Sequence, residues 1–359
     1  MTARTSGDVT TSFAASTGGG RSAASAATVS PIPRTTSCKG PGPSRAPDGR
    51  DPRDLAARAR TRHPPLARRR LLRHRTCMSV SVRKTYKLYV GGKFPRSESG
   101  RVYQPAGNTA MNVARASRKD LRDAVPAARK GLATWSGSAA YLRGQILYRL
   151  AEMLESRRDA MLQELRLGGA TPAAAKRELE TAIDLTVWYA GLCDKVESLL
   201  GSQNAVQGPF FNFTTVEPTG VIGVLAAPES PLVGTLALAL PVLAGGNAVV
   251  ALVSEAAPFA GLALGEVCAS SDVPAGAINL LSGRRDELAL QFAEHRDIDG
   301  LLIGGAPDAA LSAAAADNVK RVRYCDLPRA AWGRVEQLRQ LAWVEPFVEA
   351  KTLWHPVAP

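Results

Sequence analysis

Residues 217–250 read EPTGVIGVLAAPESPLVGTLALALPVLAGGNAVV. The run 221–226 is short and apolar, which is typical of a strand buried on both faces of a sheet. Two prolines and a glutamate then interrupt the pattern, and 232–243 is apolar over the length of a helix. A second short apolar run, 248–253, follows a Gly-Gly pair. The stretch therefore predicts a strand, a buried helix and a parallel strand.

The same alternation continues toward the C-terminus. Helices are predicted over 258–270, 286–295 and 307–318, and short strands over 277–281, 300–303 and 319–325. Repeated strand–helix units with short connections are the pattern of a parallel sheet covered on both faces. We therefore expect an α/β fold, a Rossmann-like doubly wound parallel sheet with flanking helices.

The residues before this core have other patterns. YKLYVGGKF (86–94) alternates and then turns at Gly91-Gly92, which predicts a hairpin. Further short strands are predicted at 102–103, 111–116 and 209–218, and amphipathic helices from 118 onward and over 139–157, 160–167 and 172–200. After the core, 333–341 suggests one more helix and 343–356 an extended tail.

The N-terminal segment has a different composition. Residues 1–77 carry 15 Lys and Arg but only 4 Asp and Glu, so most of the net charge of +13 lies there. It has no hydrophobic periodicity, and we predict a disordered, basic, low-complexity tail over 1–82. Three interpretations stay open: a transit peptide, a nucleic-acid-binding arm, or upstream sequence included by the choice of start codon. The third is favoured, because structured-looking sequence begins directly after Met78.

Cysteine and histidine usage limits the possible sites. The 5 cysteines are far apart with no C-x-x-C pair, and there are only 4 histidines. We therefore expect no disulfide framework and no metal site, and a reducing, cytoplasmic setting. No apolar run is long and uninterrupted enough to predict a membrane span. Because the body of the chain is nearly neutral, nucleic-acid binding is not expected of it.

Stretch 217–250 resembles the cofactor-domain core of the aldehyde dehydrogenase superfamily. Other segments agree with it in order and spacing over about 86–325: YVGGKF (89–94), the helix after Trp135, WYAG (188–191) and VPAGAINLLSG (273–283). Members of this family oxidise aldehydes with NAD(P): a cysteine thiolate attacks the carbonyl, hydride passes to the nicotinamide, and water hydrolyses the thioester. The resemblance implies an NAD-binding domain over 83–328, then a C-terminal helix and extended tail over 329–359.

The family's catalytic residues are replaced in the motifs that match. Its P-W-N-F-P asparagine, which stabilises the oxyanion, corresponds to Glu229, and an ionised carboxylate accepts hydrogen bonds only. The general-base glutamate of E-L-G-G corresponds to Cys325. No histidine or lysine is placed to lower the pKa of Cys325, so a structural cysteine is favoured over a nucleophile. The family's own nucleophile lies in a later catalytic domain, and the 31 residues after Pro328 are too few for one.

The cofactor motifs are partly kept. The family's K-P-x-E clamp on the adenine ribose reads Leu252-Val253-Ser254-Glu255, so the resemblance leaves Glu255, and weakly Ser254, as cofactor-binding candidates. An acidic residue that favours a helix N-terminus is the alternative role for Glu255. The pyrophosphate turn keeps Gly305 but adds Asp308, which disfavours phosphate. NAD(P) binding is therefore expected to be weak or lost.

Three functions follow from these expectations. The first is a catalytically inactive family member that acts as a subunit or partner of a full-length aldehyde dehydrogenase, or self-associates. The alternative is an active NAD(P)-dependent aldehyde oxidoreductase. A remote alternative is nucleic-acid binding through the basic tail.

Overall fold

The computed structural model describes residues 84–106, 108 and 110–357. The predictions for the tail over 1–82, including the role of Met78, lie outside the described residues. The remainder forms one compact unit by itself.

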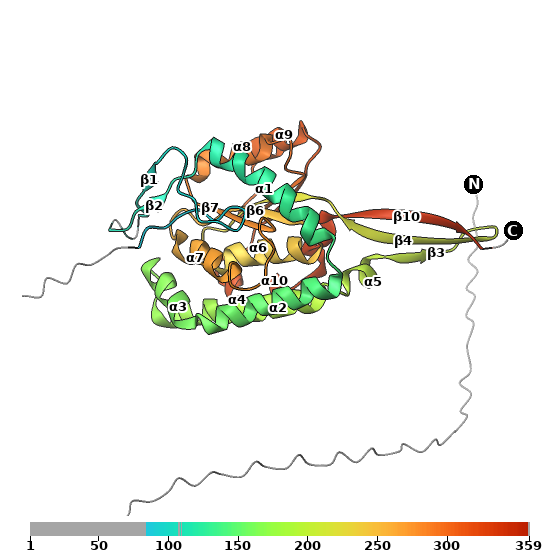
Figure 1. Cartoon of the computed structure of the whole chain (residues 1–359), viewed down its shortest axis with the longest axis horizontal. Helices are drawn as coiled ribbons and strands as arrows, with labels where there is room; N and C mark the ends of the chain where they lie inside the picture. Colours follow the sequence, from blue (N-terminus) through green and yellow to red (C-terminus); the bar gives the residue numbers. More distant parts are fainter. Residues whose placement is uncertain (1–83, 107, 109, 358–359) are drawn as a thin grey trace, which may run out of the picture. The chain divides into compact units, whose positions relative to one another are not determined.

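A parallel sheet of five strands forms its centre, as the sequence predicts (Figure 1). The strand order β7-β6-β5-β8-β9 places β5 beside both β6 and β8. Every residue of β5 through β8 is buried, which is why their sequences are continuously apolar. The strands are β5 (Val221–Leu225), β6 (Ala248–Leu252), β7 (Ile278–Leu281), β8 (Gly300–Gly304) and β9 (Arg321–Cys325).

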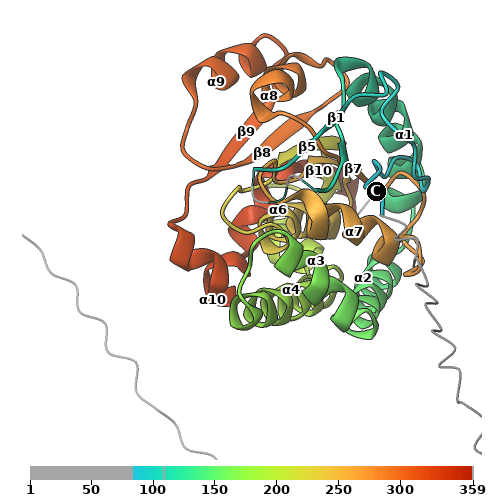
Figure 2. The same ribbon diagram turned by 90° about the vertical axis from the view of Figure 1, so that its left-hand side faces the viewer.

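Helices cover both faces of this sheet (Figure 2). Ile222 and Val224 of β5 face a core shared with α6 (Val233–Ala244) and α7 (Pro258–Cys268). Val221 and Leu225 of the same strand face the opposite core. That second core contains α1 (Arg118–Ser136), α8 (Arg285–Glu294) and α9 (Ala309–Ala316). The alternation of β5 side chains between two cores confirms the doubly wound arrangement.

A layer of helices lies outside α6. Helix α4 packs on both α2 and α6. It begins at Pro172, behind the Thr171 cap whose Oγ1 accepts the Ala174 amide at 3.3 Å. The predicted single helix over 172–200 is wrong, because the chain leaves the helix after Leu192. The elements are α2 (Ala140–Ser156), α3 (Arg158–Leu167), α4 (Pro172–Leu192) and α5 (Val196–Leu200).

Three antiparallel strands form an arm that reaches away from the parallel sheet (Figure 1). In it β4 (Phe210–Pro218) lies between β3 (Ser202–Asn204) and β10 (Val348–Pro356). Strand β10 pairs with β4 over its whole length, from Val348↔Pro218 to Pro356↔Phe210. The sequence predicted only an extended conformation here, because the pairing joins segments that are far apart in the chain.

Smaller elements complete the unit. The predicted turn at Gly91-Gly92 is present, with φ of 57° and 75° and a bridge between Val90 and Lys93. The helix predicted over 333–341 is present but shorter, as α10 (Val335–Leu338), and the 3-10 turns on either side of it help to bury Trp332, Leu338 and Phe347. The elements are β1 (Val102–Tyr103), β2 (Val113–Ala114), η1 (Arg329–Gly333), α10 (Val335–Leu338), η2 (Leu341–Trp343) and η3 (Glu345–Phe347).

Candidate functional site

The switch point of the sheet lies between β5 and β8. The chain leaves β5 toward β6 and returns to β8 on the other side, so the connections diverge at the carboxyl ends of these strands. Ligands of doubly wound folds bind in the crevice outside such a point. A cavity of about 290 Å³ lies at this edge of the sheet. Its lining includes Tyr103, Ala226, Pro228, Ser254, Glu255, Arg284 and Arg285.

Glu255 lines this cavity, but both of its carboxylate oxygens already have donors. Oε1 accepts from Arg284 Nη1 at 2.6 Å, and Oε2 accepts from the backbone amide of Arg285 at 2.9 Å. That amide belongs to the first turn of α8, so Glu255 caps the helix N-terminus. The contacts of Glu255 are therefore those expected of a residue that caps a helix N-terminus, rather than those of a free carboxylate that binds a cofactor.

Ser254 is buried at 2% exposure beside Glu255. Its hydroxyl donates to the Pro228 carbonyl oxygen at 3.4 Å. The contact joins the end of β6 to the loop after β5, and the hydroxyl is directed at the protein's own backbone.

The turn after β8 is the predicted phosphate turn. The carboxylate of Asp308 occupies the backbone amides that follow it. Gly305 has φ of +120°, a conformation that favours glycine, and its amide donates to the Cys325 carbonyl at 3.0 Å. Asp308 Oδ1 accepts from the amides of Ala310 at 2.8 Å and Leu311 at 3.2 Å. These amides at the start of α9 are the donors that a pyrophosphate would need.

Arg285 lies across the switch point, a role that the sequence did not reveal. Its Nη1 donates to the Ala226 carbonyl at 2.9 Å and its Nη2 to the Gly304 carbonyl at 2.8 Å. Burial lowers the pKa of Arg285, while the nearby charges of Glu229 and Asp308 act to raise it. The site thus holds one buried guanidinium near two carboxylates. The charged pair Arg284-Arg285, which follows an apolar strand after a short Ser-Gly turn, was the available signal.

Glu229 is exposed in the loop after β5. A second glutamate, Glu178 of α4, fixes this loop. Its Oε1 accepts from Ser230 Oγ at 2.7 Å and from the amides of Leu232 at 2.8 Å and Val233 at 3.3 Å. The loop at the oxyanion position is therefore held by the Glu178 carboxylate and carries the Glu229 carboxylate, and neither group can donate a hydrogen bond when ionised.

Cys325 is the last residue of β9 and is 1% exposed. Burial raises the pKa of its thiol to about 12, and Asp326 adds to the rise. At neutral pH the group is therefore a thiol, which is a poor nucleophile. This geometry supports the interpretation of Cys325 as a structural cysteine.

Within residues 84–106, 108 and 110–357, no cluster of His, Cys, Asp and Glu has a metal-binding arrangement. None of the helices in that part of the chain has the length and apolar character needed to cross a bilayer.

Comparisons with known proteins agree with this fold. A putative aldehyde dehydrogenase, DhaS from Bacillus subtilis, is 31% identical over 255 residues, covering 68% of this chain and 51% of its own length. The crystal structure of PnpE from Pseudomonas sp. WBC-3 superposes with a TM-score of 0.64 at 26% identity, covering 67% of this chain and 50% of PnpE. An NAD-dependent aldehyde dehydrogenase from Sinorhizobium meliloti gives a TM-score of 0.63 at 25% identity, with the same coverage.

The chain spans about half the length of these relatives. The family model of the aldehyde dehydrogenase family matches residues 94–324, which include the whole parallel sheet up to Tyr324. The match covers well over half of the chain, and it follows that this protein belongs to the aldehyde dehydrogenase family.

Proposed function

We propose that this chain is a catalytically inactive member of the family that acts as a subunit or partner of a full-length aldehyde dehydrogenase. The observation that carries the proposal is the internal charge cluster at the switch point. Arg285 bonds to the strand ends, Asp308 caps α9, and Glu255 pairs with Arg284. The groups that a dinucleotide would engage already have partners within the protein: backbone carbonyls for Arg285, backbone amides for Asp308, and Arg284 for Glu255.

The residues present therefore do not fit NAD(P). A pyrophosphate would have to displace Asp308 from the α9 amides while two carboxylates repelled it. The acidic Glu229 and the buried, neutral Cys325 stand where the family resemblance implies an amide and a general base. No step of aldehyde oxidation is assigned to this chain.

The arm supports the partner role. Phe210, Phe211, Leu353 and Trp354 are exposed by 42%, 39%, 37% and 60%, and the rings of Phe210 and Trp354 pack edge to face at 5.7 Å. Clustered exposed apolar side chains mark interfaces, and an edge strand offers unpaired backbone groups for pairing with another chain. A family member with a similar arm would present complementary strands, so mixed assembly and self-association use the same surface.

Sedimentation of the full chain, alone and with a full-length family member, tests the assembly. We expect a complex larger than one chain, and we expect the Phe211→Ser/Trp354→Ser variant to lose it. Tyr148→Ser is the matched control, since Tyr148 is an aromatic residue of α2 with 53% exposure outside the arm. A protein that sediments as a monomer under both conditions contradicts the proposal.

The second candidate is an active NAD(P)-dependent oxidoreductase. Retention of Glu255 and Gly305 favours it, and PnpE has been solved in complex with nicotinamide adenine dinucleotide. NADH absorbance with a panel of aldehydes separates the two functions. We expect no turnover by the purified chain beside the NAD-dependent aldehyde dehydrogenase of Sinorhizobium meliloti as the positive control, and turnover would favour the second candidate.

We place this role in the cytoplasm. Cys193, Cys268 and Cys325 are free and buried. Free thiols of this kind suit a reducing compartment.

A further inference from the structure

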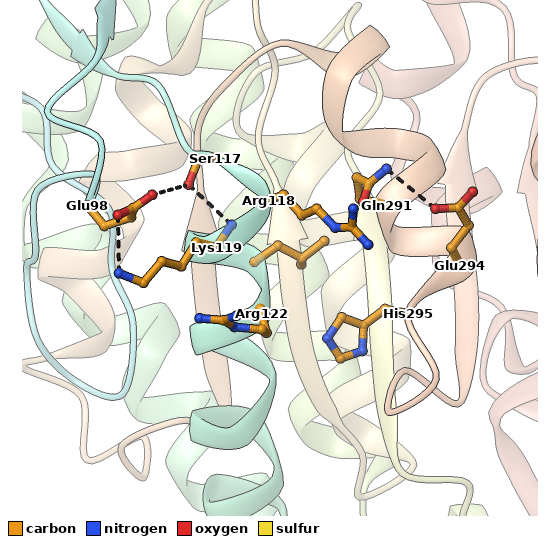
Figure 3. Close-up of a pocket in the computed structure, with 9 residues that line it drawn as sticks. Glu98, Ser117, Arg118, Lys119, Arg122, Gln291, Glu294 and His295 are labelled. Atoms are coloured by element: carbon orange, nitrogen blue, oxygen red, sulfur yellow. Dashed lines mark hydrogen bonds and ion pairs between the residues drawn. The ribbon is translucent and has the colours of Figure 1, made fainter.

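A second cavity, of about 530 Å³, lies between the start of α1 and the end of α8 (Figure 3). It is distinct from the switch-point crevice. Arg285 of the crevice opens α8 and His295 of this groove follows its last residue, so the two lie roughly 15 Å apart along the helix axis. The α1–α8 groove is lined by Glu98, Ser117, Arg118, Lys119, Leu121, Arg122, Gln291, Glu294 and His295.

The two carboxylates of the groove already have donors. Glu98 accepts from Lys119 Nζ and from Ser117 Oγ, each at 3.2 Å. Glu294 accepts from the Gln291 amide at 3.4 Å. Figure 3 shows both carboxylates at opposite sides of the group, each turned toward its donor.

The guanidiniums of Arg118 and Arg122, unlike the two carboxylates, lack strong partners among the described residues. Across the described part of the chain, no hydrogen bond or ion pair engages the Arg118 guanidinium, while that of Arg122 approaches only the carboxylate of the adjacent Asp123, at 3.6 Å. In a neighbouring cavity, by contrast, the guanidinium of Arg115 is neutralised by an ion pair with Glu287. The α1–α8 groove thus keeps two arginines whose fork of N–H donors is available.

His295 adds a third donor from the other wall. Its Nδ1 accepts from the Asp297 amide at 3.2 Å, so the neutral ring carries its proton on Nε2. Burial lowers the pKa of His295; Asp297 opposes this, and the positive charges of Lys320, Arg118 and Arg129 lower it further. Excess positive charge therefore surrounds the imidazole, which an anion would relieve.

We propose that the α1–α8 groove binds a small phosphorylated organic molecule. Arg118 and Arg122 would hold the phosphate oxygens, since planar guanidinium groups match phosphate in bidentate geometry. The imidazole of His295 donates from the opposite side. The groove volume falls within the usual range for small-molecule sites, roughly 300–1,000 Å³, so it accommodates an organic group beside the phosphate.

Isothermal titration of the full chain with ribose 5-phosphate, and with ribose as the uncharged control, tests this site. We expect saturable binding of the phosphate ester alone. Arg118→Gln/Arg122→Gln should weaken it about tenfold or more, and His295→Ala, from the other wall, should also weaken it. The control variant is Arg177→Gln, which removes an exposed arginine of α4 and should leave the affinity unchanged. All variants keep the basic N-terminal segment, so a loss of binding cannot come from its removal.

Two results overturn the proposal. One is the absence of saturable binding at millimolar ribose 5-phosphate. The other is equal affinity in the wild type and the double variant, which assigns binding to other basic residues. Because Arg118 and Arg122 are exposed, we expect the circular dichroism of the double variant to match the wild type.

Discussion

Arg285 and Gly304 are joined by a hydrogen bond of 2.8 Å between the guanidinium Nη2 and the backbone carbonyl oxygen, across 19 positions of sequence. The second nitrogen of the same guanidinium bonds to Ala226, at the end of the neighbouring strand. One side chain thus links the carboxyl ends of β5 and β8.

We expect Arg285→Ala to reduce the free energy of unfolding by about 1–2 kcal/mol, because two charge-assisted hydrogen bonds are lost at a partly exposed site. Urea unfolding of the variant and the wild type measures this difference. Arg177→Ala, an exposed arginine of α4, is the control and should change the stability little. Equal stabilities of Arg285→Ala and wild type would show that the link is not energetically important.

The buried cysteines should react slowly in the folded protein. Burial raises the pKa of Cys193, Cys268 and Cys325 to about 12, from an ordinary value of 9.0, so the thiolate is scarce at pH 8. We expect alkylation by iodoacetamide to be much slower in the native protein than in urea. Peptide-resolved mass spectrometry separates the three sites. Rapid native labelling of Cys325 would contradict its assignment as a structural residue.

The sequence predicted the parts of the molecule that depend on local pattern. Strands β5 and β8 are buried on both faces, and their continuous apolar runs made them recognisable. Strand β10 was predicted only as extended chain, because eight of its nine residues are exposed and its partner β4 lies far away in sequence. The pairing of β10 with β4 depends on the tertiary fold, which local strand propensity does not predict.

The candidate site divides in the same way. The sequence singled out Glu255 and Gly305 as candidates because they lie in short motifs of fixed spacing. Arg285 and Glu178 were missed, since each acts on backbone atoms that only the folded sheet brings near. Glu178, for example, reaches amides 54 and 55 positions along the chain. No spacing rule in the sequence connects such residues.

Gly131 should not tolerate a side chain. A Cβ atom there would lie 2.2 Å from the Gly276 carbonyl carbon and 2.4 Å from the Ala277 nitrogen, so α1 and the segment before β7 would have to separate. We expect Gly131→Ala to lower the free energy of unfolding by about 2–3 kcal/mol. Gly191→Ala in α4 is the control, since nothing lies within 4 Å of its Cβ position and alanine favours the helix. Chemical unfolding compares the two, and equal effects would contradict the close approach.

His295 should make the stability depend on pH in mildly acidic solution. Burial lowers its pKa in the folded state from the ordinary 6.5, with Asp297 opposing and Lys320, Arg118 and Arg129 assisting the shift. As the pH falls through 6.5, the unfolded chain takes up a proton that the folded chain resists, so stability decreases; above this pH the contribution is constant. We expect His295→Gln to flatten the decline between pH 7 and pH 5, measured by urea unfolding at each pH. Parallel curves for variant and wild type would mean that other groups cause the loss. Ribose 5-phosphate should shift the wild-type curve more than that of His295→Gln, because a bound anion favours the protonated imidazole and the variant binds the ligand more weakly.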